Sequence, residues 1–149
     1  GTWLSMQPFT YNDNQYPSKA QQDKHKIVVD GTDHTYNLAK KYQVKLAWGT
    51  DLLFNPMNTK NQNQGILKLQ KWFTNYEILR MVTYGNAQLL SLSGSRNPYP
   101  GRLGIIEENA WADMIILDGN AMDNIDLLGD PGKNILLIMK GGEIFKNIL

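Results

Sequence analysis

A chain of 149 residues, of which 42% are hydrophobic, is long enough to form one packed core. Its 15 basic and 14 acidic residues give a formal charge of +1 without a basic run, so we expect no nucleic-acid partner. The longest apolar run, 135–139, is too short to cross a membrane, and the first residues lack a signal-peptide pattern. The chain has no cysteine, which fits a cytosolic and a periplasmic location equally well.

The first third of the chain predicts a strand, a loop, a helix and a second strand. Residues 3–6 are typical of a short strand, and the polar run that continues to residue 26 indicates an exposed loop. Thr32-Asp33 is a good N-cap pair, and the apolar residues after it are spaced as on one face of a helix. A strand at 44–48 would complete one repeat of an α/β architecture.

Asp51 is the residue that this organisation singles out. It follows the strand at 44–48 through Gly49-Thr50, so we expect it at the C-terminal end of that strand. The C-terminal ends of the strands form the mouth of an α/β barrel, where catalytic side chains gather. A carboxylate at this place is equally typical of a helix N-cap or a turn, and the residues alone leave both interpretations open.

The middle of the chain, 62–93, predicts helices. Its apolar residues follow the helical period, and Thr74–Glu77 has the pattern of a capping box, which starts a new helix. Gly85-Asn86 predicts a break before a third, short helix.

The last third of the chain predicts strands. A period of two over 112–117 is typical of a half-buried strand. Residues 135–140 and 143–147 are typical of strands and flank Gly141-Gly142, a two-residue connection that favours a tight hairpin. The chain therefore changes from mixed helix and strand to strand alone after a turn-rich linker at 97–101.

Four stretches, in this order, resemble one known family. They read AWGTDLLF at 47–54, KWFTNYEILRMVTYGNAQLLSLSG at 71–94, NPYPGRLGIIEENAWADMIILDGN at 97–120 and ILLIMKGGEIFKN at 135–147. Together they closely resemble the C-terminal part of the metal-dependent amidohydrolase superfamily, in particular its imidazolonepropionase-like and dipeptidase-like members. The short motif GTD alone would be a weak signal, whereas the ordered set covers nearly the whole chain.

The resemblance implies a fold and a domain organisation. The expected fold is α/β: a C-terminal fragment of a (β/α)8 TIM-type barrel followed by strands of a small composite β-sandwich. Residues 1–95 would form the last strands and helices of the hydrolase barrel, and residues 96–149 would form the sandwich segment. The strand at 44–48 would be the last strand of the barrel.

The resemblance also implies a role for Asp51. The carboxylate after the last barrel strand contacts the metal centre in this family and acts as general base toward the metal-bound water. It then passes the proton to the leaving amine. A divalent metal, with zinc as the expected ion, lowers the pKa of its bound water. The implied reaction is metal-dependent hydrolysis of a carbon–nitrogen bond in a small-molecule amide, cyclic amide or dipeptide-like substrate.

The chain departs from the family in its metal ligands. The family takes its other ligands from earlier strands, including a His-x-His pair, whereas this chain contains only His25 and His34. Their charged or helical surroundings predict two surface histidines, because zinc needs three or four converging ligands. We therefore expect the ligands other than Asp51 to lie outside these 149 residues, and we expect no metal to bind to this chain alone.

This departure keeps a second interpretation open, in which the chain is a non-catalytic, truncated structural fragment. A fragment of a barrel leaves strand edges and an apolar face uncovered, and both favour pairing with another chain. The expected partners are accordingly a second copy of the chain or a missing N-terminal half.

Other residues near Asp51 leave their roles undecided. Asn55, Asn58 and Lys60 follow it where barrel loops contact substrates, but a flexible polar loop has the same composition. Trp48 lies within an apolar pattern, which predicts a core aromatic residue and not a platform for substrate. No substrate-binding residue is assigned from the sequence.

Overall fold

The computed structural model describes residues 3–5, 16–50 and 56–149. The strands are β1 (Trp3–Ser5), β2 (Lys45–Ala47), β3 (Met114–Leu117), β4 (Ile135–Lys140) and β5 (Glu143–Asn147). The helices are α1 (Lys19–Lys41), α2 (Gln62–Lys68), α3 (Asn75–Arg80), α4 (Asn86–Ser91) and α5 (Pro131–Asn134). Within the described residues they are connected by the 3₁₀ helices η2 (Pro56–Asn61), η3 (Leu69–Lys71), η5 (Gly94–Arg96) and η6 (Ile125–Gly129) and by the π-helix η4 (Met81–Gly85).

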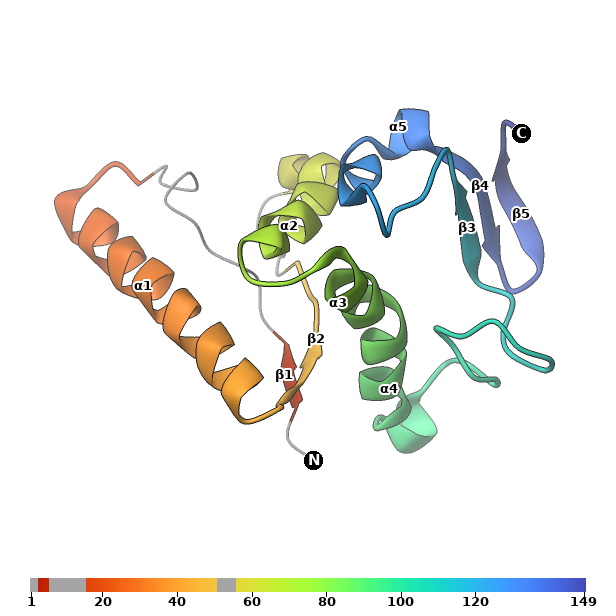
Figure 1. The fold of residues 1–149 in the computed structure, drawn as a ribbon, viewed down its shortest axis with the longest axis horizontal. Coiled ribbons are helices and arrows are strands. Elements are labelled where there is room, and N and C mark those ends of the chain that lie inside the picture. The colour runs from red at the N-terminus through yellow and green to blue at the C-terminus, as the bar shows by residue number, and fades with distance from the viewer. Residues whose placement is uncertain (1–2, 6–15, 51–55) are drawn as a thin grey trace.

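The strands of the described residues form two separate sheets. The strand β1 pairs with β2 in parallel, with Leu4 opposite Leu46, and β3, β4 and β5 form an antiparallel sheet in that order. Figure 1 shows α1 at one end of the molecule and the three-stranded sheet at the other, with the parallel pair and the remaining helices between them. The predicted strands at 3–6, 44–48 and 112–117 are therefore confirmed, and so is the α/β class in this coarse form.

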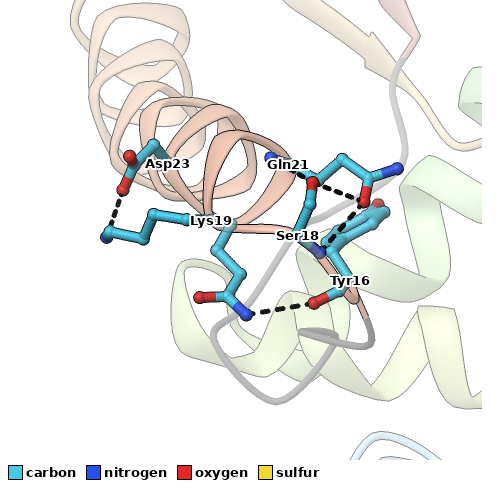
Figure 2. A network of polar contacts seen from close by, with 6 residues as sticks. Tyr16, Ser18, Lys19, Gln21 and Asp23 are labelled. Atoms are coloured by element: carbon cyan, nitrogen blue, oxygen red, sulfur yellow. Dashed lines mark hydrogen bonds and ion pairs between the residues drawn. The ribbon is translucent and has the colours of Figure 1, made fainter.

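The long helix α1 begins well before the residue at which the sequence predicts a helix. Ser18 and Gln21 form a capping box, in which the Ser18 hydroxyl accepts from the Gln21 N–H and the Gln21 amide oxygen accepts from the Ser18 N–H. Figure 2 shows this network together with the exposed ion pair between Lys19 and Asp23. The prediction of an exposed loop is wrong from residue 19 to residue 26, because this polar stretch has its own cap and supports a helix through i, i+4 pairs. The part of the predicted loop at 7–15 lies outside the described residues.

The two histidines lie in different surroundings on α1. His34 is exposed, as predicted. His25 is only 5% exposed, and its ring lies 5.1 Å from the ring of Tyr16, so the prediction of a surface histidine is wrong at this position. Neighbouring lysines in the sequence suggested a solvated residue, but side chains adjacent in a helix point in different directions.

The sequence pattern predicted that Thr32-Asp33 caps a helix, and this is wrong, because the N-cap of α1 is Ser18. Asp33 instead connects α1 to the segment before α3. Its carboxylate accepts from the indole Nε1 of Trp72 at 2.6 Å and pairs with the Lys71 ammonium at 2.7 Å. One turn further along α1, Tyr36 is 2% exposed, and its ring lies 4.9 Å from the Trp72 ring. Burial raises the pKa of Tyr36 to about 12. The network fixes α1 against the helices that follow β2.

The core lies between these helices. Its buried members come from α1, α2, η3, α3, η4 and η6, and include Ile66, Leu69, Phe73 and Ile78. The capping box predicted at Thr74–Glu77 is confirmed and starts α3. The helix break predicted at Gly85-Asn86 is wrong, because the chain continues from α3 through the π-helix η4 directly into α4.

The C-terminal sheet ends in the predicted hairpin. The strands β4 and β5 pair antiparallel and are connected by Gly141-Gly142, whose φ angles are 57° and 86°. Two successive residues in the left-handed region are what a tight hairpin turn requires, and glycine adopts this region at least cost. Across the parts of the chain that are described, no helix is both long and apolar enough to cross a membrane.

Candidate functional site

The candidate site lies at the C-terminal end of β2. Ala47, the last residue of the strand, is 3% exposed, and Trp48, Gly49 and Thr50 follow it, each half-buried. Asp51, the residue predicted to act here, lies outside the described residues. The structure therefore shows what positions the residues that precede Asp51, and the role of Asp51 stays a prediction.

Trp48 packs its side chain between β2 and the core. The indole lies against the core cluster and next to Gly65 of α2, where a Cβ atom would lie 3.3 Å from the Trp48 ring. The prediction of a packing role for Trp48 is therefore confirmed. Its Nε1 atom is buried and has no hydrogen-bond partner in the part of the chain that the structure shows.

Asn86, at the start of α4, makes a hydrogen bond to the backbone of Trp48. The Trp48 N–H donates to the Asn86 side-chain oxygen over 2.8 Å, and the two residues are 38 positions apart in the sequence. Sequence reasoning missed this contact, because Asn after Gly was interpreted as a helix break. A signal was present in the apolar spacing, which continues through Gly85-Asn86 and would have supported a continuous helix.

After Asp51, the described residues resume at the 3₁₀ helix η2. Asn58 and Lys60 fall in this 3₁₀ helix, and Lys60 is exposed, whereas Asn55 lies outside the described residues. A contact between these residues and a substrate stays a prediction.

The described residues do not by themselves fit a metal centre. Within 3–5, 16–50 and 56–149, no group of three or more His, Cys, Asp or Glu side chains is placed to hold an ion. His25 and His34 lie on α1 in different surroundings, one against Tyr16 and the other exposed. A metal site that used Asp51 would need further ligands from beyond these ranges.

A groove lies beside the other end of β2. It has a volume of about 620 Å³ and is lined by the end of α1, by Val44 and the first residues of β2, and by residues 73–88, which run through α3 into α4. Glu77 on its wall has a lowered pKa, because its carboxylate accepts a hydrogen bond from the Thr74 N–H and, less strongly, from the Thr74 hydroxyl. Trp48, Gly49 and Thr50 do not line the groove, so among the described residues it is distinct from the strand end that precedes Asp51.

Comparison with solved structures shows similarity to hydrolases. The chain matches an amidohydrolase over 97% of its own length and 34% of that protein, with a TM-score of 0.77 and 25% sequence identity. It matches a prolidase, solved with N-methylphosphonate-L-proline, with a TM-score of 0.78 and 22% identity over 97% of this chain and 35% of the other. The ochratoxinase of A. niger matches with a TM-score of 0.72 and 23% identity, over 92% of this chain and 30% of that one.

These comparisons confirm the resemblance to amidohydrolases that the sequence predicts. Two of the three similarities are below 25% identity and concern the fold alone. The chain spans about a third of the length of the structures that it matches. No protein-family profile matches it, and no curated protein matches it.

Proposed function

We propose that this chain, whose fold is that of part of an amidohydrolase, contributes the last catalytic carboxylate of a hydrolase that cleaves carbon–nitrogen bonds. The observation that carries the proposal is the structural match over 97% of the chain to an amidohydrolase of 25% identity. Within that match, β2 ends at Ala47, and Asp51 follows after Trp48, Gly49 and Thr50 in the sequence.

The topology of the parallel pair supports this position. Because β1 and β2 run in the same direction, their C-terminal ends lie at the same edge of the sheet. Open α/β sheets and α/β barrels bind ligands at this edge. We propose further that β1 and β2 are the last two strands of a (β/α)8 barrel, and that β3, β4 and β5 belong to a small composite β-sandwich.

The chemistry assigned to Asp51 is that of a general base. Its carboxylate accepts a proton from the attacking water as the new carbon–oxygen bond forms at the amide carbonyl. It returns the proton to the nitrogen as the carbon–nitrogen bond breaks, so that the products are a carboxylic acid and an amine. The proposed substrates are small amides, cyclic amides or dipeptide-like molecules.

A divalent metal, expected to be zinc, belongs to this proposal as a cofactor of the complete site. Asp51 would be the ligand that this chain supplies, and the further ligands would come from beyond the described residues. The alternative function is that of a non-catalytic structural portion, which would need neither the metal nor a charged Asp51.

Metal content and hydrolysis, measured on the same preparations, test the proposal. The hydrolase formed by this chain and the portion that supplies the other ligands, its Asp51→Asn variant and the surface control Asp23→Asn would be incubated with Zn²⁺, desalted, and assayed for bound zinc. The same samples would be assayed with N-acyl amino acids, dipeptides and a cyclic amide. Asp23 is a suitable control because it pairs with Lys19 on the exposed face of α1.

When the portion that supplies the other ligands is present, we expect wild type and Asp23→Asn to retain zinc and to hydrolyse at least one substrate class. The 149-residue chain alone should do neither. Asp51→Asn should lose the metal and lower kcat by about 100-fold or more, the usual contribution of a general base. Equal activity in Asp51→Asn would contradict the role of Asp51. Absence of both zinc and hydrolysis in the wild type would favour the structural alternative.

A further inference from the structure

The backbone of the residue that follows β2 has a side-chain partner, just beyond the last described pair of the parallel strands. The described pairing between β1 and β2 ends with Ser5 opposite Ala47. At the next residue, the Trp48 N–H donates to the Asn86 side-chain oxygen over 2.8 Å, in a half-buried setting. The Asn86 amide therefore extends the hydrogen bonding of the strand beyond its last pair.

The π-helix η4 explains why Asn86 can reach the strand. A π turn contains one residue more than an α turn, which rotates all later side chains by about 100° around the helix axis. Gly85 closes this turn, and a Cβ atom there would lie 2.7 Å from the Leu46 carbonyl oxygen. The helix thus approaches β2 closely enough for the short side chain of Asn86 to meet the Trp48 N–H.

The opposite side of η4 is also in close contact. A Cβ atom at Gly104, whose φ is 72°, would lie 2.9 Å from the backbone carbonyl of Thr83. The π-helix is therefore held between β2 on one side and the loop at Gly104 on the other. Local π turns are rare and often occur at functional sites. This agrees with a π turn in η4 that places Asn86 against the Trp48 N–H.

We propose that Asn86 is a positioning residue, which fixes the C-terminal end of β2 by holding the Trp48 N–H. In doing so it sets the direction in which Gly49 and Thr50 leave the strand. The structural part of this inference is independent of any activity. Its catalytic consequence rests on the proposed function, because Asp51 is the next residue after Thr50.

Amide hydrogen exchange measured by NMR tests the structural part. Asn86→Leu keeps the approximate size of the side chain and removes the acceptor, whereas Asn86→Asp keeps an acceptor oxygen. Asn63→Leu is the matched control, because Asn63 is also half-buried on a helix and makes a 2.8 Å bond to a distant backbone atom, the Leu128 carbonyl. Exchange at Trp48 is compared with exchange at Ile78, so that a global loss of stability cancels.

We expect Asn86→Leu to speed exchange at Trp48 about tenfold relative to Ile78, which is the effect of losing one hydrogen bond. Asn86→Asp and Asn63→Leu should keep the wild-type ratio. An unchanged ratio in Asn86→Leu would overturn the proposal, and so would an Asn86→Asp variant that exchanges as fast as the leucine variant. If the leucine variant does not fold, Asn86→Ala provides the same comparison with a good helix-forming residue.

Kinetics test the catalytic consequence separately. Asn86→Leu should lower kcat and leave KM nearly unchanged, and Asn86→Asp should restore kcat. An Asn86→Leu enzyme with full kcat, next to an inactive Asp51→Asn enzyme, would refute the positioning role in catalysis while supporting Asp51. If the hydrolase that includes the missing portion has no activity, while Asn86→Leu still speeds exchange at the Trp48 amide, the proposed function is contradicted and the structural role of Asn86 is supported.

Discussion

Asp33 shows how one carboxylate can connect two helical segments. It accepts hydrogen bonds from Lys71 and from the Trp72 indole, and these bonds, the larger from Lys71, hold its pKa below the ordinary value of 3.8. The side chain is 42% exposed, so solvent screens the charge and the ion pair alone contributes little. The bond to the partly buried indole is the contact that gives the network its geometry.

The lowered pKa of Asp33 predicts a dependence of stability on pH. The folded carboxyl holds its proton less tightly than the unfolded one, so its stabilisation is complete above the unfolded pKa and is lost as the pH falls through the folded pKa. Asp33→Asn should therefore lower the free energy of unfolding at about pH 7 by at most about 1 kcal/mol. The difference from wild type should vanish at about pH 2.

Urea unfolding of both proteins at the two pH values measures this effect. Asp23→Asn is the control, because it also breaks an exposed ion pair on α1 but does not touch the Trp72 indole. A difference between wild type and Asp33→Asn that grows toward acid pH would contradict the assigned sign.

At the level of elements, the run from α3 through η4 to α4 depends on a close approach to β2. Gly85 makes it possible, since any side chain at this position would meet the Leu46 carbonyl. Gly31, in the middle of α1, is different: a Cβ atom there would have nothing within 4 Å. The two glycines lie in helical backbone but face different constraints, which an identical substitution can separate.

Gly85→Ala should destabilise the protein by about 1–3 kcal/mol, because the overpacking against β2 exceeds the gain in helix propensity of about 1 kcal/mol. Gly31→Ala should stabilise it by about 0.5–1 kcal/mol, because it gains propensity without a clash. Thermal and urea unfolding of both variants measure these changes. Two stabilised variants would show that η4 can move away from β2 at little cost.

At the level of the whole molecule, the C-terminal third shares the core of the helices. Ile125 and Leu128 of η6 lie in the same buried cluster as Tyr36 and Ile78. The Asn63 amide reinforces this junction by donating to the Leu128 carbonyl. The domain division at residues 95 and 96 stays a prediction, but any such boundary is crossed by the packing of η6.

The three-stranded sheet leaves apolar side chains uncovered, which predicts association. Its outer strands β3 and β5 expose Ile115 and Phe145 to 46% and 64%. Edge strands with apolar side chains favour pairing with another chain. We propose that the chain forms a homo-oligomer or assembles with the N-terminal half of a longer hydrolase.

Light scattering over a range of protein concentrations tests self-association. Wild type should form dimers or larger species, and Phe145→Lys should shift the population toward monomer. Tyr42→Lys, which alters an equally exposed aromatic residue at the end of α1, should have no effect. A wild-type chain that stays monomeric at high concentration would contradict a homo-oligomer.

Patterns that involve neighbouring residues were predicted from the sequence. The capping box at Thr74–Glu77 and the hairpin at Gly141-Gly142 were predicted correctly, because caps and tight turns depend on a few adjacent residues. The start of α1 was missed although its cap at Ser18 is also local, because an apolar period was used to find helices and this stretch is mostly polar.

Contacts between distant residues were decided by the tertiary structure. The sequence determined the strand that leads to Asp51 and the resemblance that gives this residue a proposed role. Only the fold shows that Asn86 holds Trp48, that Asp33 binds Trp72 and that His25 is buried. The physical reason is that each of these contacts depends on how helices pack against β2 and one another, and periodicity along one segment carries no information about that packing.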